Sequence, residues 1–551
     1  MNQMSKKRTM VVIAGIMLGM LLGALDQTIV GTAMPRIIAL LGGMNLYAWV
    51  FTAYMLTSTT SVPIMGKLSD LYGRKPFYIG GIVVFMLGSA LSGAAQTMTQ
   101  LIIFRGLQGL GAGTMMSNSM AIVGDLFPPA ERGKWQGVMG AVFGISSVIG
   151  PTLGGFITDN LNWRWVFYVN LPVGLLAVAV LLVALPNIKN TVKRSIDYLG
   201  VATLVAAVVP MLLAFVWGGE DYAWTSPVII GLLAFSAASW AAFVAAERHA
   251  EEPILPLTLF KNSIFSVSAA VVFLTGIGMF GAINFIPLFV QGVIGTSATN
   301  SGMILTPMML GMIVSSTLAG QLISRLGRYR AISLVGLAAM GLGMFLLSQM
   351  GVHTSNALVV RNMIVLGLGL GVTMPIYVIT VQNSVSYDKL GVVTSSIQFF
   401  RSIGGTIGVA IMGSFLTSRL STNVMASLPA QVKQMVPPDR LNELVNPKIF
   451  MNPQATAQMQ NQLSGPMAEL FRQVMEAVRS ALALSLHGIF LAAFVILVLS
   501  FGINLMLKEI PLRRSHRPTP EEAQQSQPGK ANSPAASPEA INPEVIQPEE
   551  A

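Results

Sequence analysis

The chain has 551 residues, of which 53% are hydrophobic and only 10% charged, whereas soluble domains usually carry about 25% charged residues. The apolar residues fall in long blocks that no single soluble core could bury, which excludes a soluble globular protein. The net charge of +10 is carried mainly by short loops between these blocks, where membrane topology explains it better than nucleic-acid binding. Cysteine is absent, which excludes disulfides, thiolate catalysis and cysteine-ligated metals.

Hydrophobic blocks follow one another along the chain, and several hold the roughly 18 apolar residues needed to cross a bilayer core about 30 Å thick. The first block follows Lys6, Lys7 and Arg8, but it contains Asp26 and has no cleavage site, so we interpret it as an uncleaved first helix. We predict fourteen transmembrane helices, near residues 10–34, 46–66, 77–95, 100–124, 136–158, 165–186, 198–217, 227–246, 265–291, 301–323, 331–350, 357–383, 393–418 and 484–506.

Basic residues are distributed unevenly among the connections. Most Lys and Arg residues lie in both tails and in the loops that follow even-numbered blocks, whereas Arg105 and Arg401 lie inside predicted helices. Because short cytoplasmic loops carry an excess of Lys and Arg, this pattern predicts that both termini are cytoplasmic. We expect a multi-pass protein of the bacterial cytoplasmic (inner) membrane.

A glycine-rich segment occurs twice, at residues 66–74 and 320–328, after the second and the tenth block. Such internal repeats are typical of secondary transporters. We therefore predict an all-α membrane protein with an N-terminal six-helix half and a C-terminal six-helix half, two inserted linker helices, an extracytoplasmic insertion within the second half, and a disordered cytoplasmic tail rich in Pro, Ser and Glu. In order along the chain these regions are 1–186, 187–264, 265–507 with the insertion 419–483, and 508–551.

One carboxylate, Asp26, lies well inside a hydrophobic block. A charge there costs about 3 kcal/mol or more, so it normally faces a cavity or a partner. Arg105 lies inside the fourth block and is the natural partner if the two helices are neighbours. Burial disfavours a charged carboxylate and a nearby arginine favours it, so a carrier that pairs and separates the two groups could bind and release a proton. The alternatives are a tolerated polar residue near a helix end and a static ion pair.

The segment between the second and third blocks combines Gly66, Asp70, Gly73 and Arg74 in what we predict to be a tight loop. Basic residues at this place can anchor a helix at the membrane surface. Anchoring explains the cations, but it explains neither the two glycines nor the acid. In the second copy of the repeat, Ser324 stands at the position of Asp70.

The fifth block carries Gly144, Gly150, Pro151 and Gly154. Small residues at a spacing of four leave a smooth face for close helix contact, and proline permits a bend. Ordinary membrane packing uses the same spacing, so the pattern alone does not assign a function.

Together these motifs resemble the major facilitator superfamily. Residues 66–76 are similar to its conserved cytoplasmic loop between helices 2 and 3, residues 150–155 to the motif that marks its antiporters, and residues 101–113, with Arg105, to its proton-linked arginine motif. The resemblance implies a major facilitator fold with alternating access. It also implies that Asp70 caps the positive N-terminal end of the thirteenth helix, in the opposite half, and latches the inner gate.

Two further stretches narrow the resemblance. The run at residues 25–30 and the segment at residues 163–172, together with fourteen helices, are similar to the drug–proton antiporter branch of EmrB/QacA type. The resemblance covers roughly residues 9–507. Some drug pumps carry further acids in the C-terminal half, and this sequence has none that is clearly buried there, so coupling is expected to depend on Asp26.

Polar and aromatic residues within the predicted helices are candidates to line a substrate cavity, although packing is an equally good explanation for each. These candidates are Tyr54, Gln108, Asn284, Phe285, Tyr377 and Gln382. The four histidines show no metal-ligand spacing, and no phosphate-binding loop motif is present, so we expect no metal, no cofactor and no direct use of ATP.

These features predict a proton-coupled exporter of hydrophobic and amphipathic compounds, not an enzyme. Its expected partners are the lipid bilayer, protons and small amphipathic substrates, with no nucleic acid, and we expect a monomer. One alternative is an exporter of lipids or lipopeptides that uses residues 419–483. A second is a membrane sensor that does not transport, which would leave the Asp26 and Arg105 pair unexplained.

Overall fold

The structure is a computed structural model, and apart from one isolated β-bridge every regular element that it describes is a helix. This confirms the predicted all-α class for the described part of the chain. Nothing is described of residues 513–551, so the predicted tail lies almost wholly outside the described residues, as does the middle of the predicted insertion. The described residues are 4–42, 46–187, 195–219, 221–295, 298–386, 389–428 and 466–512.

Long helices form both halves of the molecule. The elements are α1 (Lys6–Leu41), α2 (Tyr47–Tyr72), α3 (Arg74–Ala94), α4 (Met98–Leu126), α5 (Pro129–Asn160), α6 (Trp165–Tyr168), α7 (Asn170–Ala184), α8 (Tyr198–Trp217), α9 (Pro227–His249), α10 (Ser263–Leu288), α11 (Ala298–Leu326), α12 (Arg330–Ser348), α13 (Asn356–Asn383), α14 (Leu390–Ser427) and α19 (Pro466–Asn504).

Twelve helices in the described part are long and apolar enough to cross a membrane, with α6 and α7 together making one span. The helices α2 and α4, of 26 and 29 residues, are not among these twelve. The predicted count of fourteen is therefore not confirmed. The physical reason is composition, because α2 carries five consecutive hydroxyl side chains at residues 57–61 and α4 carries Arg105 and Gln108.

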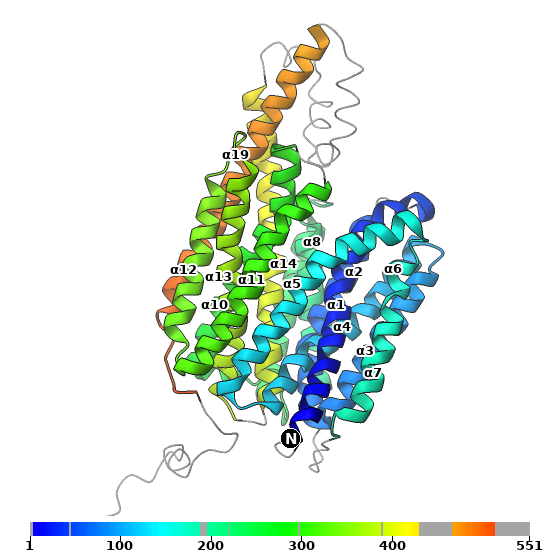
Figure 1. The fold of residues 1–551 in the computed structure, drawn as a ribbon, viewed down its shortest axis with the longest axis vertical. Coiled ribbons are helices and arrows are strands. Elements are labelled where there is room, and N and C mark those ends of the chain that lie inside the picture. Colours follow the sequence, from blue (N-terminus) through cyan, green and yellow to red (C-terminus); the bar gives the residue numbers. More distant parts are fainter. Residues whose placement is uncertain are drawn as a thin grey trace, which may run out of the picture. The chain divides into compact units, whose positions relative to one another are not determined.

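The helices pack as two groups, α1 to α7 and α10 to α19, which lie beside each other (Figure 1). In the first group α4 packs against α2 and α3, and α1 packs against α5 and α7; in the second, α13 packs against α11 and α12, and α10 packs against α14 and α19. Buried apolar side chains such as Tyr78 and Phe85 fill the first group, and Phe289, Met344 and Leu486 fill the second. The groups meet mainly through α5 with α11 and α2 with α14.

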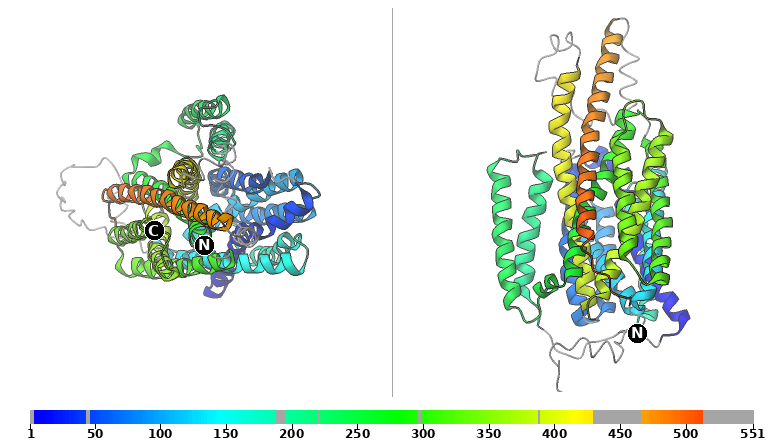
Figure 2. Two further views of the ribbon diagram at one scale, coloured as in Figure 1. Left: turned by 90° about the horizontal axis from the view of Figure 1, so that it is seen from above. Right: turned by 90° about the vertical axis from the view of Figure 1, so that its left-hand side faces the viewer.

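Two helices, α8 and α9, pack against each other and stand at the edge of the other helices (Figure 2). Only α8 of this pair makes extensive contact with the main bundle, against α2 and α14. Trp217 at the end of α8 lies edge-on to Trp49 of α2, with 5.5 Å between ring centroids. Trp224, in the connection to α9, donates a 2.7 Å hydrogen bond to Ser414 Oγ of α14.

The helices α14 and α19 extend beyond the ends of their neighbours (Figure 2). They contain 38 and 39 residues, so each is about 57 Å long at 1.5 Å per residue, nearly twice the thickness of a bilayer core. Both ends of the predicted insertion, 419–483, are helical. Buried apolar residues in these ends, including Leu420, Val424, Val478 and Leu482, belong to the core of the second group.

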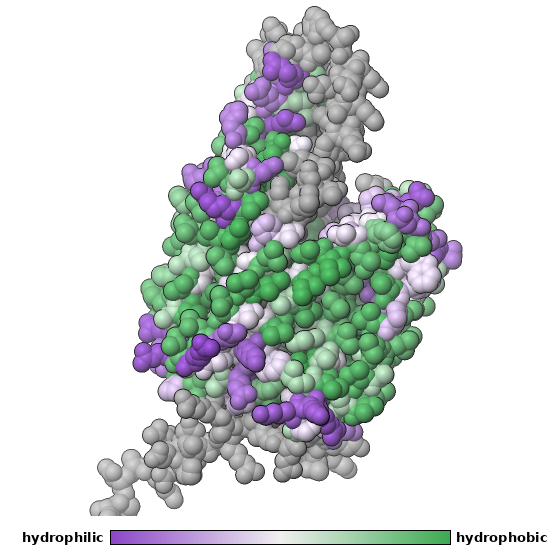
Figure 3. Space-filling model, viewed as in Figure 1, coloured by the Kyte–Doolittle hydropathy of each residue, from purple (hydrophilic) through white to green (hydrophobic). Residues whose placement is uncertain are grey.

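Apolar residues form a broad band across the face of the molecule seen in Figure 3, and hydrophilic side chains gather at both ends of that band. Large apolar side chains exposed on the helices include Val183, Leu175, Val335 and Val495. Such a surface would be unstable in water and is suited to the hydrocarbon core of a bilayer.

Candidate functional site

A buried ion pair joins α1 to α4. Asp26 is fully buried, Arg105 is 1% exposed, and 2.5 Å separates Arg105 Nη1 from Asp26 Oδ2. Gln108, one turn farther along α4, donates from Nε2 to Asp26 Oδ1 at 2.8 Å and accepts from Arg105 Nη1 at 2.8 Å. The spacing of three residues places Arg105 and Gln108 on the same face of α4, so one carboxylate can bind both.

Two further polar residues support the pair, and the sequence reasoning missed both. Asn170, at the start of α7, lies 3.3 Å from Asp26 Oδ1 and donates a 3.0 Å hydrogen bond to Ser89 of α3. Ser89 in turn donates to the carbonyl oxygen of Phe167 at 2.9 Å. The available signal was the place of Asn170 inside the motif at residues 163–172, which was used only to identify the family. We call Asp26, Arg105, Gln108, Asn170 and Ser89 the Asp26 cluster.

The ring of Tyr54, on α2, lies under the Arg105 guanidinium, with 4.3 Å from Cζ to the ring centroid. A cation over an aromatic face is attracted by the ring quadrupole. Arg105 therefore has favourable contacts on two sides, the Asp26 carboxylate and the Tyr54 ring. The Asp26 cluster thus draws on helices α1, α3, α4 and α7 and adjoins α2, so a change in the packing of this half would alter the surroundings of the carboxylate.

The predicted tight loop after the second block is wrong in extent, because α2 continues through Tyr72. Gly66 and Asp70 therefore lie on a helix, Gly73 alone breaks it, and Arg74 begins α3. Gly73 has φ +99°, a conformation that side chains disfavour, and this lets the chain turn directly from one helix into the next. The sequence favoured a loop because glycines and charges usually interrupt membrane helices.

Asp70 lies against the first turn of α14. Its carboxylate accepts hydrogen bonds from the backbone N–H groups of Gly391, at 3.2 Å, and Val392, at 2.8 Å. Backbone N–H groups at a helix N-terminus are free to bind an anion, and the helix dipole adds to the attraction. Gly66, one turn earlier on α2, lies so close to Ser395 of α14 that any side chain there would overlap the serine.

Arg74 holds Asp70 in place and also binds a residue that the sequence reasoning missed. It forms an ion pair with Asp70 and a second, at 3.0 Å, with Asp125 near the end of α4. Its guanidinium also donates to Ser69 Oγ at 2.6 Å. Asp125 directly follows the predicted block 100–124, and the sequence alone would predict that its side chain is exposed to solvent.

A second polar contact between the helix groups lies at the same end of the molecule, where the N-terminus is found (Figure 1). Arg132 of α5 donates to Gln382 Oε1 of α13 at 3.2 Å, and Gln382 donates to Thr394 of α14 at 2.8 Å. Nearby, the backbones of Gly133 on α5 and Gly320 on α11 are so close that a side chain on either would overlap the carbonyl oxygen of the other. The two groups are therefore in tight contact at this end.

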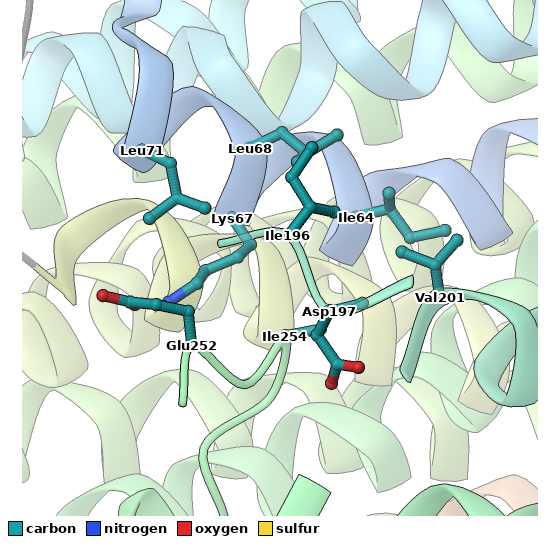
Figure 4. A pocket seen from close by; sticks show the side chains of 9 residues that line it. All are labelled: Ile64, Lys67, Leu68, Leu71, Ile196, Asp197, Val201, Glu252 and Ile254. Carbon is teal, nitrogen blue, oxygen red and sulfur yellow. The ribbon is translucent and has the colours of Figure 1, made fainter. Parts of the chain in front are cut away.

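The helices α8 and α9 are also connected to this end of α2. Lys67 of α2 forms a 2.7 Å ion pair with Glu252, just after α9. This ion pair lies beside a small hollow whose apolar walls come from α2, from α8 and from the segments that flank α8 and α9. Figure 4 shows the Lys67 amino group turned toward Glu252, with the Asp197 carboxylate pointing elsewhere.

The glycine face of α5 contacts two different helices. A side chain at Gly144 would overlap Ile313 of α11, whereas side chains at Gly150 and Gly154 would overlap threonines of α1. Pro151 also lies inside α5, next to Gly150 in the region that contacts α1. The same helix thus packs closely against the Asp26 helix and against the opposite group.

The six cavity candidates are dispersed. Tyr54 and Gln108 lie at the Asp26 cluster, Gln382 lies in the contact between the groups, and Phe285 lies in the apolar core of the second group. Asn284 is exposed and bonds to its own helix. Tyr377 donates a 3.1 Å hydrogen bond to Asn504 of α19. A substrate role for any of the six stays a prediction.

Comparison with known proteins identifies the family. The model of the Major Facilitator Superfamily matches residues 16–409. The chain is 42% identical over 537 residues to the multidrug transporter protein MdtP of Bacillus subtilis (strain 168), which covers 95% of this chain and 97% of that protein. It is also 42% identical over 410 residues to multidrug resistance protein 3 of the same organism, which covers 74% of this chain and 80% of that protein.

Among solved structures, the human organic anion transporter MFSD10 (TETRAN) superposes with a TM-score of 0.60 at 16% identity, and the match covers 90% of this chain and 100% of that chain. Similarity at this level of identity bears on the fold alone. The family match and the fold agree with each other and with the apolar helices. The chain therefore belongs to the major facilitator superfamily, a family of multi-pass membrane transporters and not of enzymes.

Proposed function

We propose that this protein is a proton-coupled antiporter that exports hydrophobic and amphipathic compounds by alternating access. The observation that carries the proposal is the fully buried Asp26 carboxylate, held by Arg105 and Gln108 between membrane helices. Ionisable residues within a membrane are costly, and they commonly mark proton or substrate pathways. The high identity to a Bacillus subtilis multidrug transporter supports drug efflux as the physiological activity.

Proton exchange follows from pairing and separating two groups. In the described structure Arg105 binds the Asp26 carboxylate. If the helices α1 and α4 move apart, the carboxylate loses this cationic partner, and we propose that it then binds a proton in place of the arginine. A proton that crosses a potential of 100 mV supplies about 2.3 kcal/mol, enough to sustain a substrate gradient of tens-fold.

Movement of the two helix groups reaches Asp26 through α5. The outer part of α5 packs on α1, where Thr28 donates a 3.2 Å hydrogen bond to the carbonyl oxygen of Ser146, and its earlier part packs on α11 through Gly144. A shift of the second group therefore displaces α5, which in turn displaces α1 relative to α4. This contiguous packing is the physical route that we propose between substrate movement and proton release.

The described conformation is closed at the end that holds the N-terminus, which we propose to be cytoplasmic in a bacterial inner membrane. Asp70 on the α14 N-terminus and Arg132 on Gln382 form this closed gate. We also propose that α2 and α4 cross the membrane between more apolar neighbours. The chain would then have fourteen spans, and we propose on this basis that it belongs to the EmrB/QacA-type branch.

The test compares Asp26→Asn with Asp159→Asn, the same change at an exposed carboxylate at the far end of α5. Both proteins are reconstituted in proteoliposomes that enclose a pH dye, and export of a fluorescent amphipathic dye is driven by an imposed proton gradient. We expect Asp26→Asn to abolish gradient-driven export and the linked proton flux, while Asp159→Asn retains both. Full coupled export by a correctly folded Asp26→Asn protein would refute the proposal.

A further inference from the structure

A second arginine, Arg401 of α14, is buried in the opposite helix group, at 6% exposure. At 1.5 Å per residue it lies about 16 Å from the first residue of α14. Its neighbours Thr275 of α10 and Thr373 of α13 lie about 15 to 18 Å from the corresponding ends of their own helices. These three estimates place Arg401 near the middle of a bilayer core about 30 Å thick.

The sequence supplies almost no carboxylate that could neutralise Arg401. Between Glu252 and Asp439 the chain contains one acidic residue, Asp388, which lies just before α14 and outside the described residues. No carboxylate of the described residues forms an ion pair with Arg401. A buried charge is normally paired, so this cation needs an explanation.

The contacts of Arg401 are long and neutral. Nη1 lies 3.3 Å from the sulfur of Met374 and 3.3 Å from Gln398 Oε1, and Nη2 lies 3.3 Å from the carbonyl oxygen of Met374. A guanidinium carries five N–H donors and binds carboxylates through two parallel hydrogen bonds. Three neutral acceptors at this distance do not match the strength of such a pair, so an anionic ligand would satisfy the group better.

Arg401 lines a small, partly open hollow between α10, α13 and α14. The other lining residues are mostly apolar or small: Thr275, Gly276, Met279, Leu370, Thr373 and Met374. Methionine side chains are flexible and polarisable, so they fit apolar groups of different shapes. The hollow thus combines one cation with adaptable apolar walls.

We propose that this hollow binds the anionic head of a lipophilic organic anion, such as an aromatic carboxylate, with the guanidinium on the head and the apolar walls on the attached rings. The inference deepens the proposed export function by naming a substrate class for the second helix group. A lipid phosphate headgroup is the weaker fit, because headgroups stay at the bilayer surface and this cation lies near the midplane.

Direct binding to the purified full-length protein in nanodiscs tests the proposal. Three probes share one ring system and differ in charge: 2-naphthoate, 2-naphthamide and 2-naphthylmethylammonium. For the wild-type protein we expect naphthoate to bind roughly tenfold more tightly than naphthamide, the difference expected for one charged hydrogen-bonded pair. Arg401→Gln should remove this preference and leave naphthamide affinity unchanged, and Arg401→Lys should retain part of it.

Two further variants make the result specific. Arg419→Gln, the same change at an exposed arginine on the same helix, should keep the wild-type preference. Met279→Phe should weaken naphthoate and naphthamide together, because it fills the hollow without changing its charge. Equal affinity of wild type for the three probes, or an unchanged preference in a folded Arg401→Gln protein, would overturn the proposal.

This experiment is independent of proton coupling. If Asp26→Asn still exports dye but naphthoate binding requires Arg401, the proton-antiport function fails and the anion site stands. If Asp26→Asn abolishes coupled export but wild type does not prefer naphthoate, the anion site fails alone. The ligand of Arg401 could also be an anionic lipid, so naphthoate binding is measured in nanodiscs with and without anionic lipid. If anionic lipid competes with naphthoate in wild type but not in Arg401→Gln, the site binds lipid and the organic-anion proposal is refuted.

Discussion

Both helix groups bury an arginine within a helix, Arg105 in α4 and Arg401 in α14, and the surroundings of these two side chains differ. Arg105 has a carboxylate, a glutamine and a tyrosine ring around it, and its charge is neutralised within the protein. Arg401 has a methionine, a glutamine and a backbone carbonyl, all neutral. The ion pair of Arg105 with Asp26 is suited to proton exchange, whereas Arg401, which has no ionic partner among the described residues, is suited to binding an anionic ligand.

An arginine-to-glutamine substitution should lower the stability of the protein strongly at position 105 and little at position 401. This difference is the largest effect that we expect. Arg105→Gln leaves Asp26 buried without its cation, which costs about 3 kcal/mol or more and abolishes coupled export. Arg401→Gln removes a buried charge that has no ionic partner, so the free energy of unfolding should stay within about 1 kcal/mol of wild type. Thermal unfolding of the purified proteins measures both. Equal losses in the two variants would break the comparison.

A double mutant sharpens the first half of that comparison. In Asp26→Asn/Arg105→Gln both charges are gone, so the protein should recover about 1 to 3 kcal/mol of the stability that Arg105→Gln alone loses. The free energy of unfolding is measured for wild type, the two single mutants and the double mutant, which together form a thermodynamic cycle. A second cycle that uses Asp159→Asn instead of Asp26→Asn is the control for two residues that do not interact. Additive losses would mean that the pair contributes nothing specific to stability.

The gate gives a smaller, conformational effect. Asp70→Ala removes two charge-assisted hydrogen bonds to the α14 N-terminus, so the population open at the N-terminal end should rise by roughly tenfold. The chain has no native cysteine, so spin labels at Tyr72→Cys and Leu326→Cys report one distance between the groups. Glu131→Gln, at an exposed carboxylate near the same end, is the control. Unchanged distance distributions in Asp70→Ala would count against a latch.

The smallest effect concerns Tyr377. Tyr377→Phe removes one buried hydrogen bond to Asn504 and should lower the free energy of unfolding by about 1 kcal/mol. Denaturation in detergent measures the change, with Tyr198→Phe, at an exposed tyrosine, as the control. Unchanged stability together with altered substrate preference would instead support the predicted cavity role of Tyr377.

Much of this molecule could be predicted from sequence because charges in long apolar blocks are rare enough to stand out. Asp26 and Arg105 were visible for that reason. Asn170 and Ser89 were not, since small polar residues are common where membrane helices pack. Asp125 escaped notice because its partner, Arg74, comes from another helix, and sequence spacing says nothing about which distant segments meet.

The extent of the individual helices was hard to predict from the sequence. Hydropathy located the apolar blocks, but it missed the continuation of α2 through Asp70, where the polar side chains face other helices instead of lipid. It also ended the thirteenth block at residue 418, whereas α14 continues through Ser427 and buries residues such as Leu420 against protein. Hydropathy reports contact with lipid, and these segments are stabilised by contact with each other.

The helices α8 and α9 contact both helix groups. Glu252 and Trp217 bind α2 near its two ends, through Lys67 and Trp49, while Trp224 binds Ser414 of α14. Since α2 and α14 belong to opposite helix groups, any rocking of one group against the other must tilt this pair or break one of its fastenings. If the two groups rock against each other as we propose, α8 and α9 act as a mechanical load on that movement, because at least one of these contacts has to change in each cycle.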